Sequence, residues 1–345
     1  MKNKSSKILE CVPNFSEGQN ESVIIEIQKS IAKISGVKIL HVDIGKSANR
    51  TVITFAGDPE AVVEAAFQAA NKASELIDMT KHKGIHPRIG ATDILPLVPV
   101  QCITLKEAKE LSYLLARRIG NELKIPVYCY EQSALKSNRK KLENIRAGEY
   151  EGLKDKIADP LWKPDFGPSE FNAKSGATII GARDFLVAYN VNLNTQSVEI
   201  ASEIASKIRN SGKTIFDKKG NKKQIPGLFK SIKAIGWYIE EYHIAQVSMN
   251  LTDINETPMH IAFETVKELA KESGLEVTGS ELIGLIPKKA LIDAGTFYAS
   301  DMKNVEVNND DVLIKLAIEK MGLNKLKPFN TKERLIEYSL MQINC

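Results

Sequence analysis

The amino-acid sequence predicts an α/β (α+β) protein with two ferredoxin-like-type subdomains, each built on an antiparallel or mixed sheet. The length of 345 residues favours two compact units over one. Residues 8–77 show the order strand, helix, strand, strand, helix, which is most of a ferredoxin-like βαββαβ unit. The second half of the chain repeats this order. We therefore expect the boundary between the subdomains near residue 180.

Helix-start signals and apolar runs define the elements of the first half. Asp58 caps a helix whose first turn accommodates Pro59 without losing a hydrogen bond. Thr104 and Glu107 have the spacing of a capping box before another helix. The link 46–49 between two strand-like runs is short, which favours a hairpin. The expected strands are 8–12, 37–45, 50–57, 93–100 and 126–132, and the expected helices are 21–34, 58–77 and 104–119.

The second half follows an aromatic-containing segment at 158–175. We predict a structured loop there, because flexible linkers seldom carry tryptophan and phenylalanine. The run GATIIGARDFLVAYNVNL (176–193) is predicted as one strand after a glycine-rich turn. The other expected elements are helices at 197–209, from 257 and from 287, strands at 231–241, 243–253 and 275–286, and a basic, glycine-punctuated excursion at 212–227.

The composition excludes several classes of protein. Apolar residues make up 43% and charged residues 26% of the chain, which is typical of a globular protein with a substantial core. The net charge of +4 is too small for a nucleic-acid-binding protein but suits anionic small substrates. No apolar run is long enough for a membrane span or a signal peptide, and no CxxC pair occurs. We therefore expect a cytoplasmic protein that binds neither nucleic acid nor membrane.

The stretch KHKGIHPRIG (81–90) concentrates chemically active groups between a helix and a strand. His82 and His86 are four residues apart, as in HExxH metal sites. Gly84 and Pro87 make a helix unfavourable, so we expect no metal site. A neutral histidine can accept and return a proton near neutral pH, which makes His82 a candidate general base. From residue type alone, a loop histidine bonded only to the backbone is an equally good interpretation.

Further clusters place polar residues at strand ends, where binding sites are often built. They are CVPNFSEG (11–18), DIGKSANRT (43–51) and DFGPSEF (165–171). Each is also compatible with an ordinary turn, for which asparagine, serine and glycine are common. The lysine-rich run 213–223 is either a solvated surface or a landing site for a polyanionic tail.

Several blocks in a fixed order extend these patterns over most of the chain. They are ECVPNFSEG, DIGKSANRTVITFAG, HKGIHPRIGATDILPLVPV, DFGP, GATIIGARDFLVAYNVNL and AIGWYIEEYHIAQVSMNLTD. From about residue 8 to about residue 338, the sequence resembles the glutamate formimidoyltransferase family. The resemblance implies a transferase that moves the formimino group of N-formimino-L-glutamate to N5 of tetrahydrofolate, in histidine degradation. The products are 5-formimidoyltetrahydrofolate and L-glutamate.

The same resemblance implies architecture and partners. It implies two α/β subdomains with a substrate tunnel between them, in a chain that forms a homodimer. The implied partners are small molecules: formiminoglutamate as donor and tetrahydrofolate as co-substrate, including polyglutamylated forms, without a metal.

The resemblance also implies which residues form the site. His82 matches the family's general base, and a neutral imidazole there would take the proton that N5 loses and return it to the departing glutamate nitrogen. Phe166 or Phe171 would offer the pterin ring a flat apolar contact. The implied folate-binding stretch is Lys163, Pro164, Asp165, Phe166, Gly167, Pro168, Ser169, Glu170, Phe171 and Asn172. Further expected substrate contacts, from membership of the other blocks, are Asn14, His41, Asp43, Asn49, Arg50, His86 and Arg88.

The C-terminal segment departs from the bifunctional members of that family. In those members a stretch like KPFNTKERLIEY (327–338) leads into a cyclodeaminase domain, whereas this chain ends at Cys345. We expect subdomains at 1–180, which holds His82, and 181–326, followed by a tail at 327–345 with no cyclodeaminase domain. Two alternatives stay open: a formyltransferase that uses N-formylglutamate or 5-formyltetrahydrofolate on the same fold, and a non-catalytic folate-binding protein.

Overall fold

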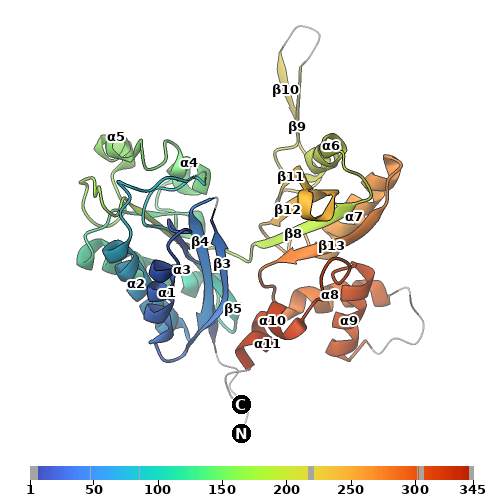
Figure 1. Ribbon diagram of the computed structural model, residues 1–345, viewed down its shortest axis with the longest axis horizontal. Helices are drawn as coiled ribbons and strands as arrows, with labels where there is room; N and C mark the ends of the chain where they lie inside the picture. The colour runs from blue at the N-terminus through green and yellow to red at the C-terminus, as the bar shows by residue number, and fades with distance from the viewer. Residues whose placement is uncertain are drawn as a thin grey trace. The chain divides into compact units, whose positions relative to one another are not determined.

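The structure is a computed structural model that describes residues 7–46, 48–84, 86–216, 221–300, 302 and 307–341 (Figure 1). The chain divides into two compact units, Met1–Asp184 and Phe185–Cys345. Both units combine helices with sheets, which confirms the predicted α/β class. The tunnel between subdomains stays a prediction.

The first unit is built on a seven-stranded sheet. Its strands are β1 (Ile8–Cys11), β2 (Asn14–Phe15), β3 (Val37–Gly45), β4 (Arg50–Gly57), β5 (Thr92–Gln101), β6 (Val127–Cys129) and β7 (Thr178–Ala182). β1 and β2 follow one another between β4 and β5, and Pro13, which lacks a backbone N–H, separates them. β3 pairs with β4 as the predicted hairpin. These pairings are antiparallel, whereas β7 lies parallel to β5 and β6, so the sheet is mixed.

The helices of the first unit begin where the sequence signals predict. Asp58 accepts hydrogen bonds from the backbone of Glu60 and Ala61, and Thr104 forms the complete capping box with Glu107. The helices are α1 (Glu21–Ala32), α2 (Pro59–Leu76), α3 (Leu105–Glu122), α4 (Leu142–Arg146) and α5 (Leu153–Ala158), with short 3₁₀ turns η1 (Glu131–Ser133), η2 (Ser137–Arg139) and η3 (Pro160–Trp162).

Alternating side chains give the sheet of the first unit two different cores. α1, α2 and α3 bury their apolar faces against residues such as Leu95 of β5 and Ile180 of β7. The neighbouring residues Ile94 and Ile179 point to the other face, where they pack with α4, α5 and Tyr128. Among the described strands, the second core includes residues of β5, β6 and β7. α4 and α5 therefore pack near β5, the strand that follows the 81–90 loop.

The second unit contains a four-stranded antiparallel sheet in the order β11-β12-β8-β13. The strands are β8 (Val187–Leu193), β11 (Ile232–Ile239), β12 (Ile244–Leu251) and β13 (Val277–Ile283). The helices are α6 (Val198–Ile208), α7 (Met259–Glu272), α8 (Lys288–Ala299), α9 (Asp310–Lys320), α10 (Thr331–Arg334) and α11 (Ile336–Met341), and η4 is Glu240–Tyr242. The order β8-α6-β11-β12-α7-β13 is the ferredoxin-like βαββαβ unit. Within the described ranges, no helix combines the length and apolar character that a membrane crossing requires.

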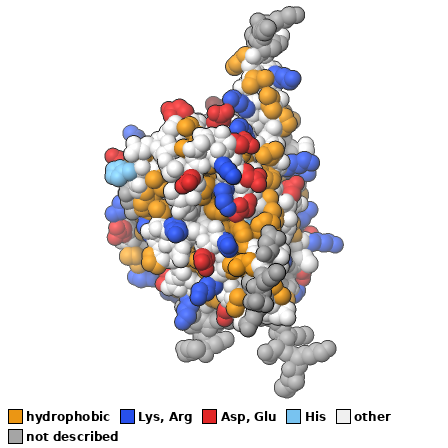
Figure 2. All heavy atoms as spheres, turned by 90° about the vertical axis from the view of Figure 1, so that its right-hand side faces the viewer, with side chains coloured by type: hydrophobic (Ala, Val, Ile, Leu, Met, Phe, Trp, Pro, Cys, Tyr) orange, Lys and Arg blue, Asp and Glu red, His pale blue; other side chains and the backbone are white. Residues whose placement is uncertain are grey.

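The excursion at 212–227 forms a hairpin inserted between α6 and β11. β9 (Lys213–Phe216) pairs with β10 (Lys222–Ile225), and the hairpin extends away from the sheet of the second unit (Figure 1). Figure 2 shows hydrophobic and basic side chains along it. Phe216 of β9 is 69% exposed. Of the lysine run, Lys213, Lys222 and Lys223 are exposed, while Lys218 and Lys219 lie outside the described residues.

One predicted element is wrong. The run 176–193 is two strands, because β7 belongs to the sheet of the first unit and β8 to that of the second. β7 is buried and almost wholly apolar, so it shows no alternation, whereas β8 alternates Asn190 and Asn192 with apolar residues. Arg183 and Asp184 mark the break. Smaller differences are that β6 is shorter than the predicted strand 126–132 and that α9 follows the predicted final helix.

Candidate active site

The stretch 81–90 is a loop between α2 and β5, and backbone bonds hold both of its ends. The Met79 N–H donates to the Lys174 carbonyl over 2.9 Å, and the Ala91 N–H donates to the Ser175 carbonyl over 2.9 Å. The described residues at the start of this loop, His82 to Gly84, are not helical. This confirms that the two histidines do not share a helical face.

The turn of the β3–β4 hairpin closes against this loop. A Cβ added to Gly84 would lie 2.4 Å from the carbonyl oxygen of Ala48. A Cβ added to Gly18, in the β2–α1 loop, would lie 2.6 Å from the carbonyl oxygen of Gly45. Glycine at both positions therefore allows three loops to approach one another closely.

Asn49, in the hairpin turn, joins the three loops. Its Oδ1 accepts a hydrogen bond from the Gly18 N–H over 2.9 Å, and its Nδ2 donates to the Lys83 carbonyl over 2.8 Å. Asn49 has φ = +49°, a left-handed conformation that asparagine tolerates better than most residues. Its side chain is buried and bonded to backbone on both sides, so Asn49 sets the spacing of the loops.

His82 has a hydrogen-bond partner at each ring nitrogen. Its Nε2 lies 2.9 Å from the carbonyl oxygen of Asn49, and its Nδ1 lies 3.2 Å from Nε of Arg88. A carbonyl only accepts and an arginine N–H only donates, so Nε2 carries the proton and Nδ1 is the acceptor. The site therefore defines a neutral imidazole in one tautomer, with its lone pair on Nδ1.

A closely packed crevice, too narrow for a water molecule, brings His82 together with five of the seven other predicted contacts outside 163–172. It is lined by Asn14, Phe15, Ser16, Ala48, Asn49, Arg50, His82, His86, Arg88 and Asp93. His41 and Asp43 lie on β3 and do not line it, and neither do the residues of the stretch 163–172. Residues distant in sequence thus meet at the β2 and β4 ends and the 81–90 loop.

Cations surround one buried carboxylate in this crevice. Arg50 donates from Nε to Oδ1 of Asn14 over 2.9 Å, and burial lowers the pKa of Arg50. Asp93 accepts a hydrogen bond from the Ile89 N–H over 2.9 Å and forms an ion pair with Arg146 of α4. Burial raises the pKa of Asp93, and Arg146 opposes that shift. Sequence reasoning missed Asp93 and Arg146, because neither stands in a polar cluster.

His86 differs from His82 in its hydrogen bonding. Its Nδ1 is buried and has no hydrogen-bond partner among the described residues. Burial, together with the positive charges of Arg50 and Arg146, lowers the pKa of His86 to about 4. At neutral pH, His86 is therefore an uncharged ring with an unpaired nitrogen at the crevice.

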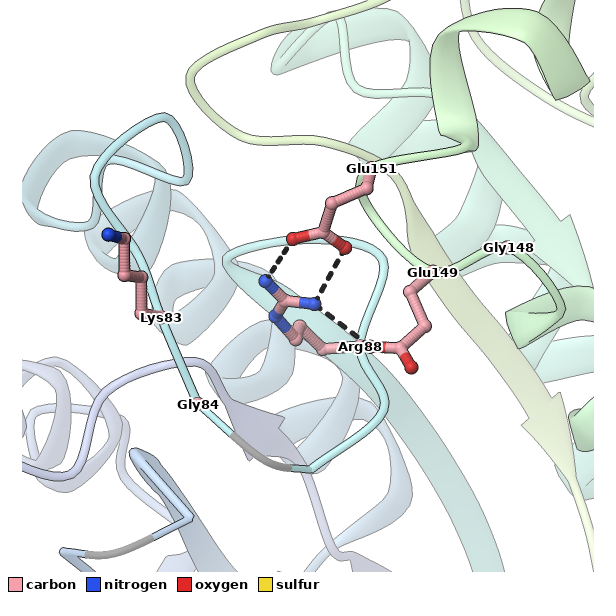
Figure 3. Close-up of a pocket in the computed structure, with 6 residues that line it drawn as sticks. All are labelled: Lys83, Gly84, Arg88, Gly148, Glu149 and Glu151. Atoms are coloured by element: carbon pink, nitrogen blue, oxygen red, sulfur yellow. Dashed lines mark hydrogen bonds and ion pairs between the residues drawn. The ribbon is translucent and has the colours of Figure 1, made fainter.

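Arg88 separates the crevice from an outer depression of about 480 Å³ lined by Lys83, Gly84, Arg88, Gly148, Glu149 and Glu151 (Figure 3). Its Nη1 donates to Glu149 and to Glu151, each over 2.9 Å, and its Nη2 donates to Glu151 over 2.6 Å. Figure 3 shows the guanidinium turned toward these carboxylates, with the Lys83 amine pointing away from them. The two glutamates follow α4 and lie far from the loop in sequence, so no local pattern revealed them.

The stretch 163–172 is anchored by a buried ion pair. Arg139, which is 0% exposed, donates to Oδ1 of Asp165 over 2.5 Å and to the Lys163 carbonyl over 2.8 Å. The other carboxylate oxygen of Asp165 accepts from the Cys129 N–H over 2.8 Å. Asp165 is therefore occupied in holding the loop to β6.

The two phenylalanines of this stretch already contact protein rings. Phe166 packs on the core with its ring centroid 6.4 Å from that of Tyr113, and Phe171 lies 5.7 Å from Tyr150. Tyr150 stands between Glu149 and Glu151 in the sequence, so the Phe171 contact ties the loop to the Arg88 side of the site. The exposed residues of the stretch are Lys163, Gly167, Ser169 and Glu170.

Comparison with known proteins identifies the family of this site. The family model for the formiminotransferase domain, N-terminal subdomain, matches residues 8–183, and the model for the formiminotransferase domain matches residues 188–341. The chain belongs to the formiminotransferase family. This confirms the resemblance found in the sequence blocks.

Relatives in the formiminotransferase family are similar over long stretches. A formimidoyltransferase-cyclodeaminase of Gallus gallus is 47% identical over 96% of this chain and 60% of its own length. Glutamate formimidoyltransferases of Streptococcus pyogenes and Thermoplasma acidophilum are 45% and 43% identical over 85% and 84% of this chain, and over 93% and 92% of their own lengths. The chain thus spans about 60% of the length of the cyclodeaminase-type relatives. A microcompartment protein of Desulfitobacterium hafniense aligns over 81% of this chain and 94% of its own length, with a TM-score of 0.21 and 12% identity. A likeness this weak supports no conclusion about fold or function.

A variant of Asp165 tests whether its ion pair with Arg139 anchors the 163–172 stretch. Asp165→Asn leaves the Arg139 charge buried without its carboxylate, and we expect the free energy of unfolding to fall by about 3–5 kcal/mol. Urea unfolding measures this change, with the exposed neighbour Glu170→Gln as control, for which we expect a change within about 0.5 kcal/mol. A normal unfolding free energy for Asp165→Asn would show that the pair does not anchor the loop.

The lowered pKa of His86 predicts a pH dependence of stability. Below its ordinary pKa of 6.5 the unfolded chain binds a proton at His86, while the folded protein does so only near about 4. The unfolded state therefore holds more protons in this window, and stability from this group is lost as the pH falls from 6.5 to 4. We expect His86→Asn to reduce the drop in Tm between neutral and acidic pH, whereas His243→Asn, at an exposed position, leaves it unchanged. Equal drops in the wild type and His86→Asn would contradict the prediction.

Proposed function

We propose that this chain transfers the formimino group of N-formimino-L-glutamate to N5 of tetrahydrofolate, giving 5-formimidoyltetrahydrofolate and L-glutamate. The observation that carries the proposal is the similarity to glutamate formimidoyltransferases of which this chain covers more than nine-tenths. The crevice supports it, because it combines a proton acceptor, a second neutral imidazole and cations suited to an anionic donor.

The proposed proton transfers use His82. As N5 of tetrahydrofolate bonds to the formimino carbon, its proton passes to Nδ1 of His82, and the Asn49 carbonyl stabilises the imidazolium through the Nε2–H. When the bond between that carbon and the glutamate nitrogen breaks, Nδ1 returns the proton to the departing nitrogen. The Arg88 N–H must leave Nδ1 first, and its 3.2 Å distance is at the long end for a hydrogen bond. An amine nucleophile and a histidine base complete this sequence without a metal.

The proposed substrate contacts divide between two regions. Arg50 and the unpaired Nδ1 of His86 face the donor at the crevice. For the larger folate, tetrahydrofolate being the co-substrate, we propose the exposed part of 163–172, with Asp165 and Phe166 as its supports. His41 and Asp43 stay predicted contacts outside the crevice.

We further propose that the chain acts in the cytoplasm as a homodimer, with subdomains 1–180 and 181–326 and a tail at 327–345. The support for the compartment is chemical: Cys11, Cys102 and Cys129 form no disulfide among the described residues, as expected in a reducing environment. Size-exclusion chromatography with light scattering measures the oligomeric state, and a monomer at micromolar concentration would contradict the dimer.

Removing the proposed base tests the mechanism. We expect His82→Ala to lower kcat by about 10² or more while tetrahydrofolate binding is kept, because the proton acceptor acts in the transition state. Formation of the folate product is followed by absorbance with formiminoglutamate and, separately, with N-formylglutamate as donor. Lys81→Ala, an exposed neighbour, serves as control. No product from either donor would refute the transferase proposal, and product from the formyl donor alone would favour the formyltransferase.

The exposed lysines of β9 and β10 generate a test for polyglutamylated folate. We expect Lys222→Glu with Lys223→Glu to raise KM for a polyglutamylated tetrahydrofolate several-fold and to leave KM for the monoglutamate unchanged, because only the longer substrate has the extra negative charges. Equal changes in KM for both substrates would show that the hairpin lysines do not bind the polyglutamate tail.

A further inference from the structure

Arg88 has little capacity left to bind a substrate carboxylate. A guanidinium carries five N–H groups. In Arg88 the Nε–H binds His82, two bonds from Nη1 reach Glu149 and Glu151, and one from Nη2 reaches Glu151. The residue is 5% exposed. The hydrogen-bond partners of Arg88 are thus other protein groups. Arg88 therefore affects the reaction through its hydrogen bond to His82.

The turn that carries the two glutamates is backbone-strained. Gly148 and Glu149 have φ = +86° and +54°, and the Gly152 N–H closes the turn on the Gly148 carbonyl over 2.7 Å. A left-handed conformation is unfavourable for glutamate. The turn nevertheless presents both carboxylates to one guanidinium, as Figure 3 shows. The ion pairs with Arg88 offset that strain.

The charges of this cluster also fit the proton transfer. A bare arginine cation beside Nδ1 would keep His82 unprotonated at rest, but it would oppose the imidazolium that forms during transfer. Two carboxylates on the far side of the guanidinium offset its charge. The same carboxylates can retain the guanidinium when its Nε–H leaves Nδ1 for the proton transfer.

We propose that Glu149 and Glu151 are positioning residues for the transfer reaction, which hold Arg88 beside His82 Nδ1 at rest, retain the guanidinium when its Nε–H leaves that nitrogen, and offset its charge so that His82 can act as the base. The proposal rests on the proposed function, and it replaces the expectation that Arg88 binds substrate. Both glutamates come from the segment between α4 and α5, which therefore takes part in the active site from outside the crevice.

The test begins with substrate-free protein, so that it does not depend on the reaction. The chain has five histidines, and the ring signal of His82 in an NMR titration is assigned by its loss in His82→Asn. Glu151→Gln should move the titration midpoint of that signal to lower pH, and Arg88→Met should move it to higher pH. The double variant should behave like Arg88→Met, because Glu151 acts through Arg88. A Glu151→Gln shift of equal size in the Arg88→Met background would show a direct effect and overturn the positioning role.

Kinetics provide the second measurement. We expect Glu151→Gln to lower kcat about tenfold with KM within about threefold, and Glu151→Asp to recover part of the loss. The Glu151 side chain is 65% exposed, so its neutralisation leaves the fold intact. The matched control is Glu122→Gln, which removes one of the two glutamates bound to Arg118 on α3, away from any histidine.

The outcomes separate this proposal from the function on which it rests. An active wild type whose kcat and His82 titration are unchanged by Glu151→Gln would overturn the positioning role alone. An inactive wild type would refute the proposed transferase. In that case a lower His82 midpoint in Glu151→Gln and a higher one in Arg88→Met would still establish the coupling of Glu151 to His82. If Arg88→Met does not fold, Glu149→Gln with Glu151→Gln replaces it: a larger downward shift than in Glu151→Gln supports the proposal, and no larger shift contradicts it.

Discussion

The bonds of the Asn49 side chain fix the distance between the loops that carry the site. One amide group binds the backbone of the β2–α1 loop and of the 81–90 loop, while the main-chain carbonyl of the same residue binds His82. The left-handed conformation of Asn49 is what directs the side chain and the carbonyl to these partners. The tautomer of His82, and with it the identity of the basic nitrogen, depends on this one turn residue.

The distribution of charge around the crevice follows from burial. Arg88 is offset by two carboxylates and Arg146 by Asp93, whereas Arg50 donates to the neutral amide of Asn14. The surroundings of His86 are consequently positive, which suits an anionic donor and keeps that imidazole uncharged. One set of cations thus serves both to attract a substrate and to select the protonation state of a nearby group.

The sequence predicted those features that depend on neighbouring residues. Three predictions of this kind are confirmed: the helix caps Asp58 and Thr104, the β3–β4 hairpin, and the non-helical loop at 81–90. Each depends on interactions between residues that are close in sequence. The glutamates on Arg88 could not be predicted, because their meeting depends on α4 and α5 packing over β5–β7. The same holds for Asp165, whose partner Arg139 is distant in sequence and buried.

The split of the predicted strand 176–193 shows another limit of local patterns. A strand buried on both faces, such as β7, is a continuous apolar run, which a local pattern easily joins to the strand that follows it. What separates β7 from β8 is which sheet each joins, and sheet membership is a property of the whole fold. The six sequence blocks include loops that the fold brings together, but only the folded chain shows which of their residues meet.

The β9–β10 hairpin bears on how this family of chains can vary. Within the described residues, none of the hairpin's side chains belongs to the core of the second unit. Its exposed edges would invite pairing with other chains, and its lysines discourage such aggregation through mutual repulsion. Because its ends leave and rejoin the unit between α6 and β11, the hairpin is a natural place for insertion or shortening, where the chain tolerates change in length without repacking its interior.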